Sequence, residues 1–294
     1  IGALETGSQV WQPKNYDGKF DGMMRLRTAL AKSKNLVSVR VIRKIGPSYT
    51  QEFIQRFGFE PEKHPPYLTM ALGAGSVTPL QMASAYSVFA NGGYFVNPYL
   101  IDKVTDAKGQ ILFQADPVRV GKNALRVLDE RTTFVMDSML QEITKTGTAA
   151  RARPALGRND IAGKTGTTND SHDAWFAGYN PKVVAVAWIG FDKPASLGDR
   201  ETGGGLALPM WISYMSVASY LEKNKDRFLQ ELFDLLRIPS VSADPKFKGD
   251  VVAAAHFVKN SLEKAGADRV EICETPGFPI VYGEKIIDPK LPTV

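Results

Sequence analysis

Two short motifs in this chain of 294 residues carry hydroxyl, ammonium and amide groups in a spacing that suits acyl transfer. In Lys164-Thr165-Gly166-Thr167, the ammonium and hydroxyls would form charge-assisted hydrogen bonds with a terminal carboxylate. Gly166 would leave an edge strand bare enough to accept an extended peptide as one more strand. The backbone N–H of Thr167 suits an oxyanion hole, a device worth about 3–4 kcal/mol. In Ser33-Lys34-Asn35, a hydroxyl beside an amide can relay a proton to a leaving amine.

The four letters of the first motif occur twice in the chain. At Lys145-Thr146-Gly147-Thr148 no strand pattern follows, which is typical of the C-terminal cap of a helix ending near Ile143, with Gly147 as the stop. The copy at 164–167 stands before an apolar hairpin, the context that an edge strand requires. We therefore interpret 164–167 as the functional copy. For Ser33-Lys34-Asn35 taken alone, the alternative is a helix C-terminus in which Asn35 takes a left-handed turn.

The elements expected around these motifs mix helices with antiparallel strands. Thr78 is expected to cap a helix that starts at Pro79 and ends before Gly92-Gly93. The apolar runs Asp173–Tyr179 and Val183–Asp192 predict a hairpin in the middle of a sheet. Further helices are predicted over residues 23–32, 36–44, 51–57, 131–143, 220–237 and 250–265, and further strands over 100–105, 111–113, 270–273 and 280–282. This mixture predicts an α+β fold.

Composition places the chain among globular proteins and excludes several classes of partner. Hydrophobic residues make up 44% and charged residues 23%, which is ordinary for a folded domain. The net charge is +5, but basic residues neither form a run nor alternate with aromatic ones, so no nucleic-acid partner is expected. The three histidines lie far apart in sequence, and we expect no metal site and no cofactor. Cys273, the single cysteine, excludes an internal disulfide.

Neither a membrane helix nor a signal peptide is recognisable. No apolar run approaches the ~20 residues that a membrane helix needs, so no membrane segment is expected in this chain. Residues 1–7 read as sequence from the middle of a domain rather than as a signal peptide. We interpret the chain as a fragment of a longer protein.

Residues 1–218 resemble the class A penicillin-binding proteins, which are bifunctional peptidoglycan synthases, in the order and spacing of their motifs. The resemblance implies the penicillin-binding transpeptidase fold, shared with serine β-lactamases and incomplete here. It implies a D,D-transpeptidase that cross-links peptidoglycan stem peptides by serine acyl transfer and binds β-lactam antibiotics. It also implies a place at the periplasmic face of the bacterial inner membrane. The segments that carry it are Trp11–Phe20, Leu26–Asn35, Gly73–Ala83, Gly163–Asn169, Asp173–Tyr179 and Trp188–Phe191.

The resemblance also implies a role for each matched motif residue. Within Ser33-Lys34-Asn35, the serine would shuttle a proton, the asparagine would assist it and contact the donor peptide, and the lysine between them would be incidental. Lys164 would orient Ser33 and set the local positive potential. Thr165 and Thr167 would bind the terminal carboxylate of the donor stem peptide, on either side of Gly166. The N–H of Thr167 would complete the oxyanion hole.

One part of the family's machinery is absent from this chain. In the family, the nucleophile and its general base belong to a Ser-x-x-Lys segment upstream of the first residues present here. The spacing recurs only at Ser261-Leu262-Glu263-Lys264, on a charged segment that we interpret as a solvated helix face. Loss of the nucleophile costs on the order of 10⁶ in turnover in a serine protease. We therefore expect an inactive transpeptidase domain, with a large cavity where a helix is missing. The alternative is a module that binds stem peptides or β-lactams without covalent chemistry.

Residues 219–294 differ in character from the rest. Residues 228–242, 281–284 and 291–294 resemble the start of zinc-dependent dipeptidases of the aminoacylase and carboxypeptidase-G type, without their metal ligands. The expected organisation is therefore a partial transpeptidase domain at 1–218 and a partial, poorly packed α/β metallopeptidase-like segment at 219–294. An assembly error or a cloning junction would produce such a join near residue 218. A further alternative is that the dipeptidase fragment defines the function.

Overall fold

The computed structural model describes residues 4–6, 9–168, 171–199 and 201–288, and these form two compact units, residues 1–217 and residues 218–294. Asn169 and Leu291–Val294, which belong to motifs considered above, lie outside the described residues. No helix in the described part of the chain is long and apolar enough to cross a bilayer.

The first unit begins with a short pair of strands and continues into a helical region. Thr78 caps α4 as predicted: its hydroxyl accepts from the N–H of Gln81, whose side chain accepts from the N–H of Thr78. The helix predicted from Met23 begins later, at Leu26, because Arg25 is extended. The α-helices of this unit are α1 (Leu26–Ala31), α2 (Asn35–Ile45), α3 (Pro47–Ile54), α4 (Pro79–Ala90), α5 (Glu130–Lys145) and α6 (Ala152–Leu156), and short 3-10 turns cover Gln55–Phe57, Pro61–Lys63 and Leu68–Leu72.

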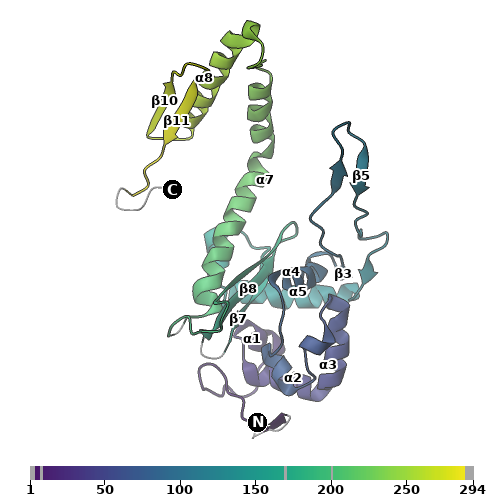
Figure 1. Ribbon diagram of the computed structural model, residues 1–294. Coiled ribbons are helices and arrows are strands. Elements are labelled where there is room, and N and C mark those ends of the chain that lie inside the picture. The colour runs from purple at the N-terminus through teal and green to yellow at the C-terminus, as the bar shows by residue number, and fades with distance from the viewer. Residues whose placement is uncertain (1–3, 7–8, 169–170, 200, 289–294) are drawn as a thin grey trace. The chain divides into compact units, whose positions relative to one another are not determined.

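A three-stranded antiparallel sheet lies at the centre of the first unit (Figure 1). It consists of β7 (Ala162–Thr167), β8 (Asp173–Tyr179) and β9 (Val184–Gly190) in that order. Lys164 pairs with Ala177, and Gly166 with Trp175. In the described residues β7 has a strand neighbour on one side only, so the candidate motif lies on an edge strand, as predicted. Smaller two-stranded pairs join β1 (Leu4–Thr6) to β2 (Gln9–Trp11), β3 (Tyr94–Phe95) to β6 (Leu125–Arg126), and β4 (Lys103–Thr105) to β5 (Ile111–Gln114).

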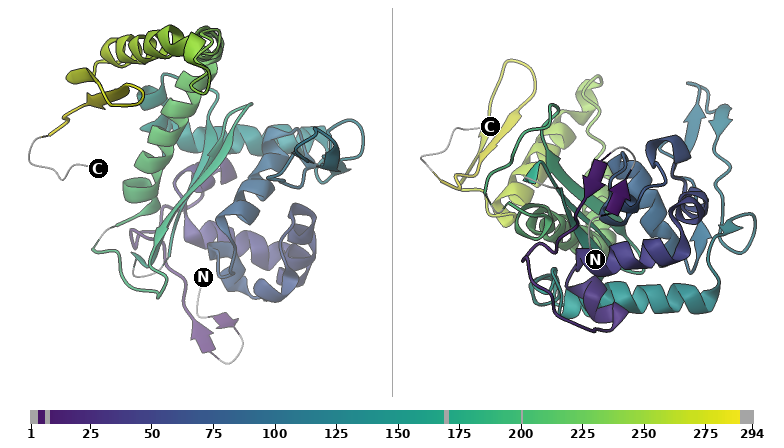
Figure 2. Two further views of the ribbon diagram at one scale, coloured as in Figure 1. Left: turned by 45° about the horizontal axis from the view of Figure 1, so that its top comes forward. Right: turned by 90° about the horizontal axis from the view of Figure 1, so that it is seen from below.

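Helices cover both faces of this sheet (Figure 2). On one face, Trp211 packs edge-on against Phe176 with ring centroids 4.9 Å apart, and its indole N–H donates to the carbonyl of Ala185 at 3.0 Å. On the other face, Tyr86 of α4 meets Tyr179 of β8. Because strand residues point alternately to the two faces, Phe176 and Tyr179 lie on opposite faces of β8. The small residues Ala177 and Gly178 lie between them and leave room for the helices to approach the sheet closely. The main buried cluster of the unit forms around these contacts.

Helix α7 (Leu208–Leu236) follows a π-helical turn at Gly203–Ala207. We predicted a helix that starts at Tyr220, but the observed helix starts twelve residues earlier, at Leu208. It continues without a break past residue 218, where a join was expected. Its apolar first turns bury Leu208, Trp211 and Met215, which explains why helix continues where only a change of composition is visible in sequence.

The second unit holds α8 (Lys248–Lys264) and an antiparallel pair, β10 (Arg269–Cys273) with β11 (Ile280–Glu284). These elements agree with the helix and strands predicted there. Among the described residues of this unit only Ala255 is buried, and large apolar side chains such as Phe233, Ile280 and Ile287 are exposed. The unit therefore has a thin core.

Candidate functional site

The turn between α1 and α2 presents the hydroxyl of Ser33. The N–H of Ser33 donates to the carbonyl of Leu30, and the N–H of Lys34 donates to that of Ala29. Ser33 itself has φ +53°, a left-handed conformation that is unusual for a residue other than glycine. We expected a left-handed residue in the alternative reading of this motif, but at Asn35, which instead begins α2. Backbone strain at a non-glycine residue is often found at functional sites.

Lys164 of β7 reaches this turn. Its ammonium donates to the Ser33 hydroxyl at 2.8 Å and to the carbonyl of Thr165 at 2.7 Å. Burial lowers the pKa of Lys164 to about 8, because water can no longer solvate the charged form fully. The structure thus brings together one residue from each of the two motifs. The lowered pKa means that the Lys164 ammonium loses its proton more readily than an exposed lysine does.

The two threonines of the motif lie on the opposite face of β7 from Lys164. Side chains alternate along a strand, so Lys164 and Gly166 face one side, and Thr165 and Thr167 the other. The hydroxyl of Thr167 accepts from the N–H of Gly203 at 3.0 Å. The N–H of Thr168 donates toward β8, to Asp173, so by the same alternation the N–H of Thr167 points to the open edge. Groups from both faces can converge on a ligand only over this edge.

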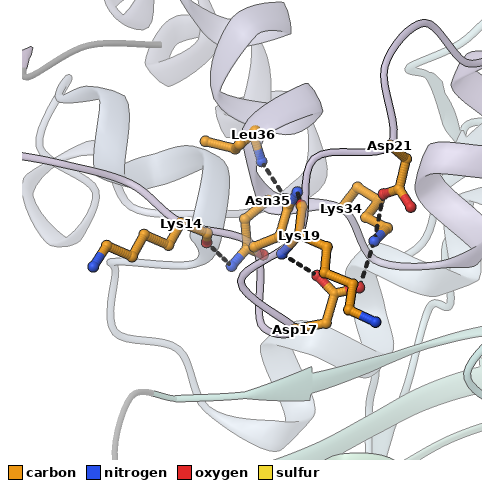
Figure 3. A network of polar contacts seen from close by, with 8 residues as sticks. Lys14, Asp17, Lys19, Asp21, Lys34, Asn35 and Leu36 are labelled. Atoms are coloured by element: carbon orange, nitrogen blue, oxygen red, sulfur yellow. Dashed lines mark hydrogen bonds and ion pairs between the residues drawn. The ribbon is translucent and has the colours of Figure 1, made fainter.

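Asn35 does not contact Ser33 or Lys164 through any hydrogen bond in the described residues. Its amide donates to the carbonyl of Lys14 at 2.9 Å, and the N–H of Leu36 donates to the side chain of Asn15 at 3.1 Å (Figure 3). Both bonds fasten the start of α2 to the segment that precedes α1. The amide of Asn35 therefore holds the Ser33 turn in place in this structure.

Lys34 was expected to be incidental, yet its side chain is buried in this network. Its side chain is 8% exposed, and its ammonium contacts the carboxylates of Asp17 at 2.7 Å and Asp21 at 2.5 Å (Figure 3). The hydrogen bond that Lys34 donates to Asp17, and then the one that it donates to Asp21, raise the pKa of Lys34. Sequence reasoning missed this cluster, since lone charges spaced by more than ten residues carry no local signal.

A cavity of about 520 Å³ borders the Lys164 face of β7. Met82 and Tyr86 of α4 line one side of the cavity. Trp175 and Trp188, whose ring centroids are 6.0 Å apart, line another side. The remaining lining comes from the 72–79 loop, from residues 164–168, and from Asp173 and Ala177 of β8. This Lys164 cavity places one cationic group and the Asp173 carboxylate, which accepts from the indole N–H of Trp188 at 2.8 Å, amid mainly apolar walls. That composition suits a small ligand with a few polar groups.

The second copy of the four-letter motif lies beside the first. Lys145 ends α5, and the turn at Gly147 follows it as predicted. The hydroxyl oxygens of Thr148 and Thr165 are 2.7 Å apart, a contact that sequence reasoning missed. The only sign of this contact in the sequence is the repeat of the four letters. We set the copy at 145–148 aside because no strand follows it.

The remaining sequence candidate, Ser261, belongs to α8 of the second unit. The hydroxyl of Ser261 donates to the carbonyl of Phe257 within α8, so it is occupied on an exposed helix face of the second unit. Among the described residues, no three His, Cys, Asp or Glu side chains are grouped so that they could hold a metal ion.

Known proteins similar to this chain share one family. Residues 2–207 match the model of the penicillin binding protein transpeptidase domain. The chain is 52% identical over 209 residues to penicillin-binding protein 1A of Neisseria lactamica, covering 71% of this chain and 26% of that protein. It is 43% identical over 298 residues to the Neisseria cinerea protein of that name, covering 94% of this chain and 37% of the relative.

Solved structures show the same likeness. The crystal structure of penicillin-binding protein 1A from Haemophilus influenzae superposes with a TM-score of 0.69 at 38% identity, covering 74% of this chain and 38% of that one. The first unit therefore has the expected transpeptidase fold of helices with an antiparallel sheet. The chain spans only about a quarter to two fifths of the length of these relatives.

Proposed function

Because the chain belongs to the penicillin-binding protein transpeptidase family, we propose that residues 1–218 are the D,D-transpeptidase domain of a class A peptidoglycan synthase, inactive in this chain. The domain binds stem peptides and β-lactams through its Lys-Thr-Gly-Thr strand. It does not acylate, since the Ser-x-x-Lys segment that supplies the nucleophile in the family is absent from these 294 residues. The family relationship also supports a location at the periplasmic face of the bacterial inner membrane.

The observation that carries this proposal is the 2.8 Å hydrogen bond from Lys164 to Ser33 beside the edge strand. The bond sets a proton-carrying hydroxyl next to a cation whose pKa is near neutrality, the arrangement that a proton relay to a leaving group needs. The open edge of β7 would receive the peptide as an added strand, with its carboxylate held by Thr165 and Thr167. The N–H of Thr167 would then face the peptide carbonyl that a nucleophile attacks in family members that carry one.

Labelling with a fluorescent penicillin, read on a denaturing gel and by intact mass, tests the absence of covalent chemistry. We expect no adduct from folded protein. A stoichiometric adduct would contradict the proposal and show that some serine is activated, with Ser33 and Ser261 the first candidates for peptide mapping. Circular dichroism of the same sample excludes an unfolded protein as the cause of a negative result.

Reversible binding is the second half of the test. Trp175 and Trp188 line the Lys164 cavity, so their fluorescence should change when an acylated D,D-dipeptide with a free carboxylate binds. Lys164→Gln should weaken this binding at least tenfold, because a charged hydrogen bond contributes about 1.5–3 kcal/mol. The matched control is Lys145→Gln, which alters the same letter of the second copy at an exposed position. Equal losses in both variants, or no saturable binding by the wild type, would sink the proposal.

The dipeptidase resemblance of residues 219–294 remains a proposal about that segment alone. The match to the Neisseria cinerea protein covers 94% of this chain, more than residues 1–218 make up, which favours a penicillin-binding origin for part of the second unit as well. Zinc-dependent hydrolysis of a dipeptide by the purified chain would reverse this preference.

A further inference from the structure

The second copy of the four-letter motif, residues 145–148, touches both halves of the candidate site. The N–H of Thr148 donates to the carbonyl of Ala31 at 3.1 Å. Ala31 ends α1, two residues before Ser33. The hydroxyl of Thr148 lies 2.7 Å from that of Thr165, the residue after Lys164. One residue outside the functional motif thus bridges the two segments that supply Ser33 and Lys164.

The backbone of this turn is held independently of the Thr148 hydroxyl. The N–H groups of Gly147 and Ala149 both donate to the carbonyl of Ile143, at 3.1 and 3.2 Å. A Cβ on Gly147 would overlap the carbonyl of Ala31, so only glycine allows the turn to approach α1 this closely. The position of the Thr148 side chain is therefore built into the end of α5.

A second contact ties the same turn to the loop that holds Thr167. The guanidinium of Arg151 donates to the carbonyls of Gly204 and Gly205. The neighbouring Gly203 donates its N–H to the hydroxyl of Thr167 at 3.0 Å. Both carboxylate-binding threonines proposed above are consequently supported from residues 148–151, one directly and one through the 203–205 backbone.

A threonine hydroxyl has one donor hydrogen and two acceptor lone pairs. When Thr165 donates its hydrogen to a ligand carboxylate, its oxygen can accept the hydrogen of Thr148. The result is a chain from Thr148 through Thr165 to the carboxylate, in which each bond polarises the next. When Thr148 is the donor in this pair, the hydroxyl hydrogen of Thr165 is not used in the bond between them. That hydrogen can then point toward a ligand at the open edge of β7.

We infer that Thr148 is a positioning residue for carboxylate recognition: its hydroxyl aims that of Thr165 at the terminal carboxylate of a bound D,D-peptide. The inference rests on the proposed function of the Lys-Thr-Gly-Thr strand. It assigns the repeated motif a task beyond capping a helix, and it predicts that the task concerns the carboxylate rather than the rest of the ligand.

The test compares the binding of two ligands to variants of the full chain by tryptophan fluorescence. The ligands are an acylated D,D-dipeptide with a free carboxylate and the same dipeptide as its C-terminal amide. Thr148→Val removes the hydroxyl with little change of shape, and Thr148→Ser keeps it. Thr146→Val is the matched control, since its hydroxyl bonds only to Glu142 within α5 in the described residues.

Thr148→Val should weaken carboxylate binding about three- to tenfold, the range of one neutral hydrogen bond, and leave amide binding nearly unchanged. Thr148→Ser and Thr146→Val should bind both ligands like the wild type. In a Thr165→Val background, Thr148→Val should have no further effect, because it acts through Thr165.

Three results would overturn the inference. They are equal affinity of wild type and Thr148→Val for the carboxylate ligand, equal weakening for carboxylate and amide, and a Thr148→Ser variant as weak as the valine. If Thr148→Val does not fold, Thr148→Ala, which also lacks the hydroxyl, replaces it in both backgrounds. Absence of saturable binding by the wild type overturns the proposed function itself, and with it this inference.

Discussion

The ammonium of Lys164 lies 2.8 Å from the hydroxyl of Ser33, although 131 residues separate them along the chain. Removal of the hydroxyl would leave a partly buried ammonium hydrogen without this acceptor, which costs about 1–3 kcal/mol. Ser33→Ala should therefore lower the free energy of unfolding in urea by about that amount. Ser48→Ala, at an exposed position on α3, should change it by less than about 0.5 kcal/mol. Equal effects would show that Ser33 and Lys164 are not coupled.

The lowered pKa of Lys164, about 8, predicts opposite pH trends for binding and stability. The unfolded chain keeps this proton up to the ordinary lysine pKa of 10.5, so stability rises between pH 8 and pH 10.5. Over the same interval the folded protein loses the positive charge that attracts a carboxylate, so affinity for the D,D-dipeptide falls as the pH rises through 8. Binding and unfolding titrations should show both trends, and Lys164→Gln should remove them. A Lys145→Gln profile without the trends would contradict the assignment.

Trp211 is the largest fully buried side chain against the sheet, with 1% of its surface exposed. Trp211→Ala removes its contact with Phe176 and should destabilise the first unit by about 3–5 kcal/mol. Tyr214→Ala on the same helix is the control, because Tyr214 is 57% exposed. Chemical unfolding followed by the fluorescence of the remaining tryptophans measures both. A loss below 1 kcal/mol for Trp211→Ala would mean that α7 does not pack on the sheet.

Gly203 lies so close to β7 and β8 that a Cβ would overlap the carbonyls of Gly166 and Trp175. Gly203→Ala should displace this loop from the sheet, remove the hydrogen bond to Thr167 and cost about 1–3 kcal/mol. Gly249→Ala offers the contrast, since nothing lies within 4 Å of its added Cβ and α8 gains a better helix former. Thermal unfolding should rank Gly203→Ala below the wild type and Gly249→Ala at or above it; the reverse order would refute the packing described here.

Lys34→Met should loosen the segment before α1, because Asp17 and Asp21 then face each other without a counter-charge. Hydrogen exchange at residues 14–22 should become faster, with exchange in β8 unchanged. Lys32→Met, at an exposed neighbouring position, is the control. The hydrogen bond from Lys34 lowers the pKa of Asp17, so wild-type protection should also fade as acid protonates Asp17. Unchanged exchange in Lys34→Met would remove the structural role given to this pair.

Several features could be predicted from sequence because their causes are local. Thr78 and Pro79 mark the start of α4 within one turn, and the apolar run at residues 173–179 predicts a strand. The same local reasoning told the two motif copies apart, since a strand follows only Thr167. It misplaced the start of α7, because Pro209 in the first turn is a weak start signal on its own. Packing of Trp211 on the sheet stabilises these first turns of the helix.

The sequence by itself determined the family, the edge strand that carries Lys-Thr-Gly-Thr, and the absence of Ser-x-x-Lys from the first unit. Tertiary structure alone decided which side chains meet: Ser33 with Lys164, Thr148 with Thr165, and Lys34 with two aspartates. The physical reason is range. Caps, turns and strand alternation depend on hydrogen bonds and sterics within a few residues, whereas these contacts join residues that become neighbours only when helices and sheet pack together.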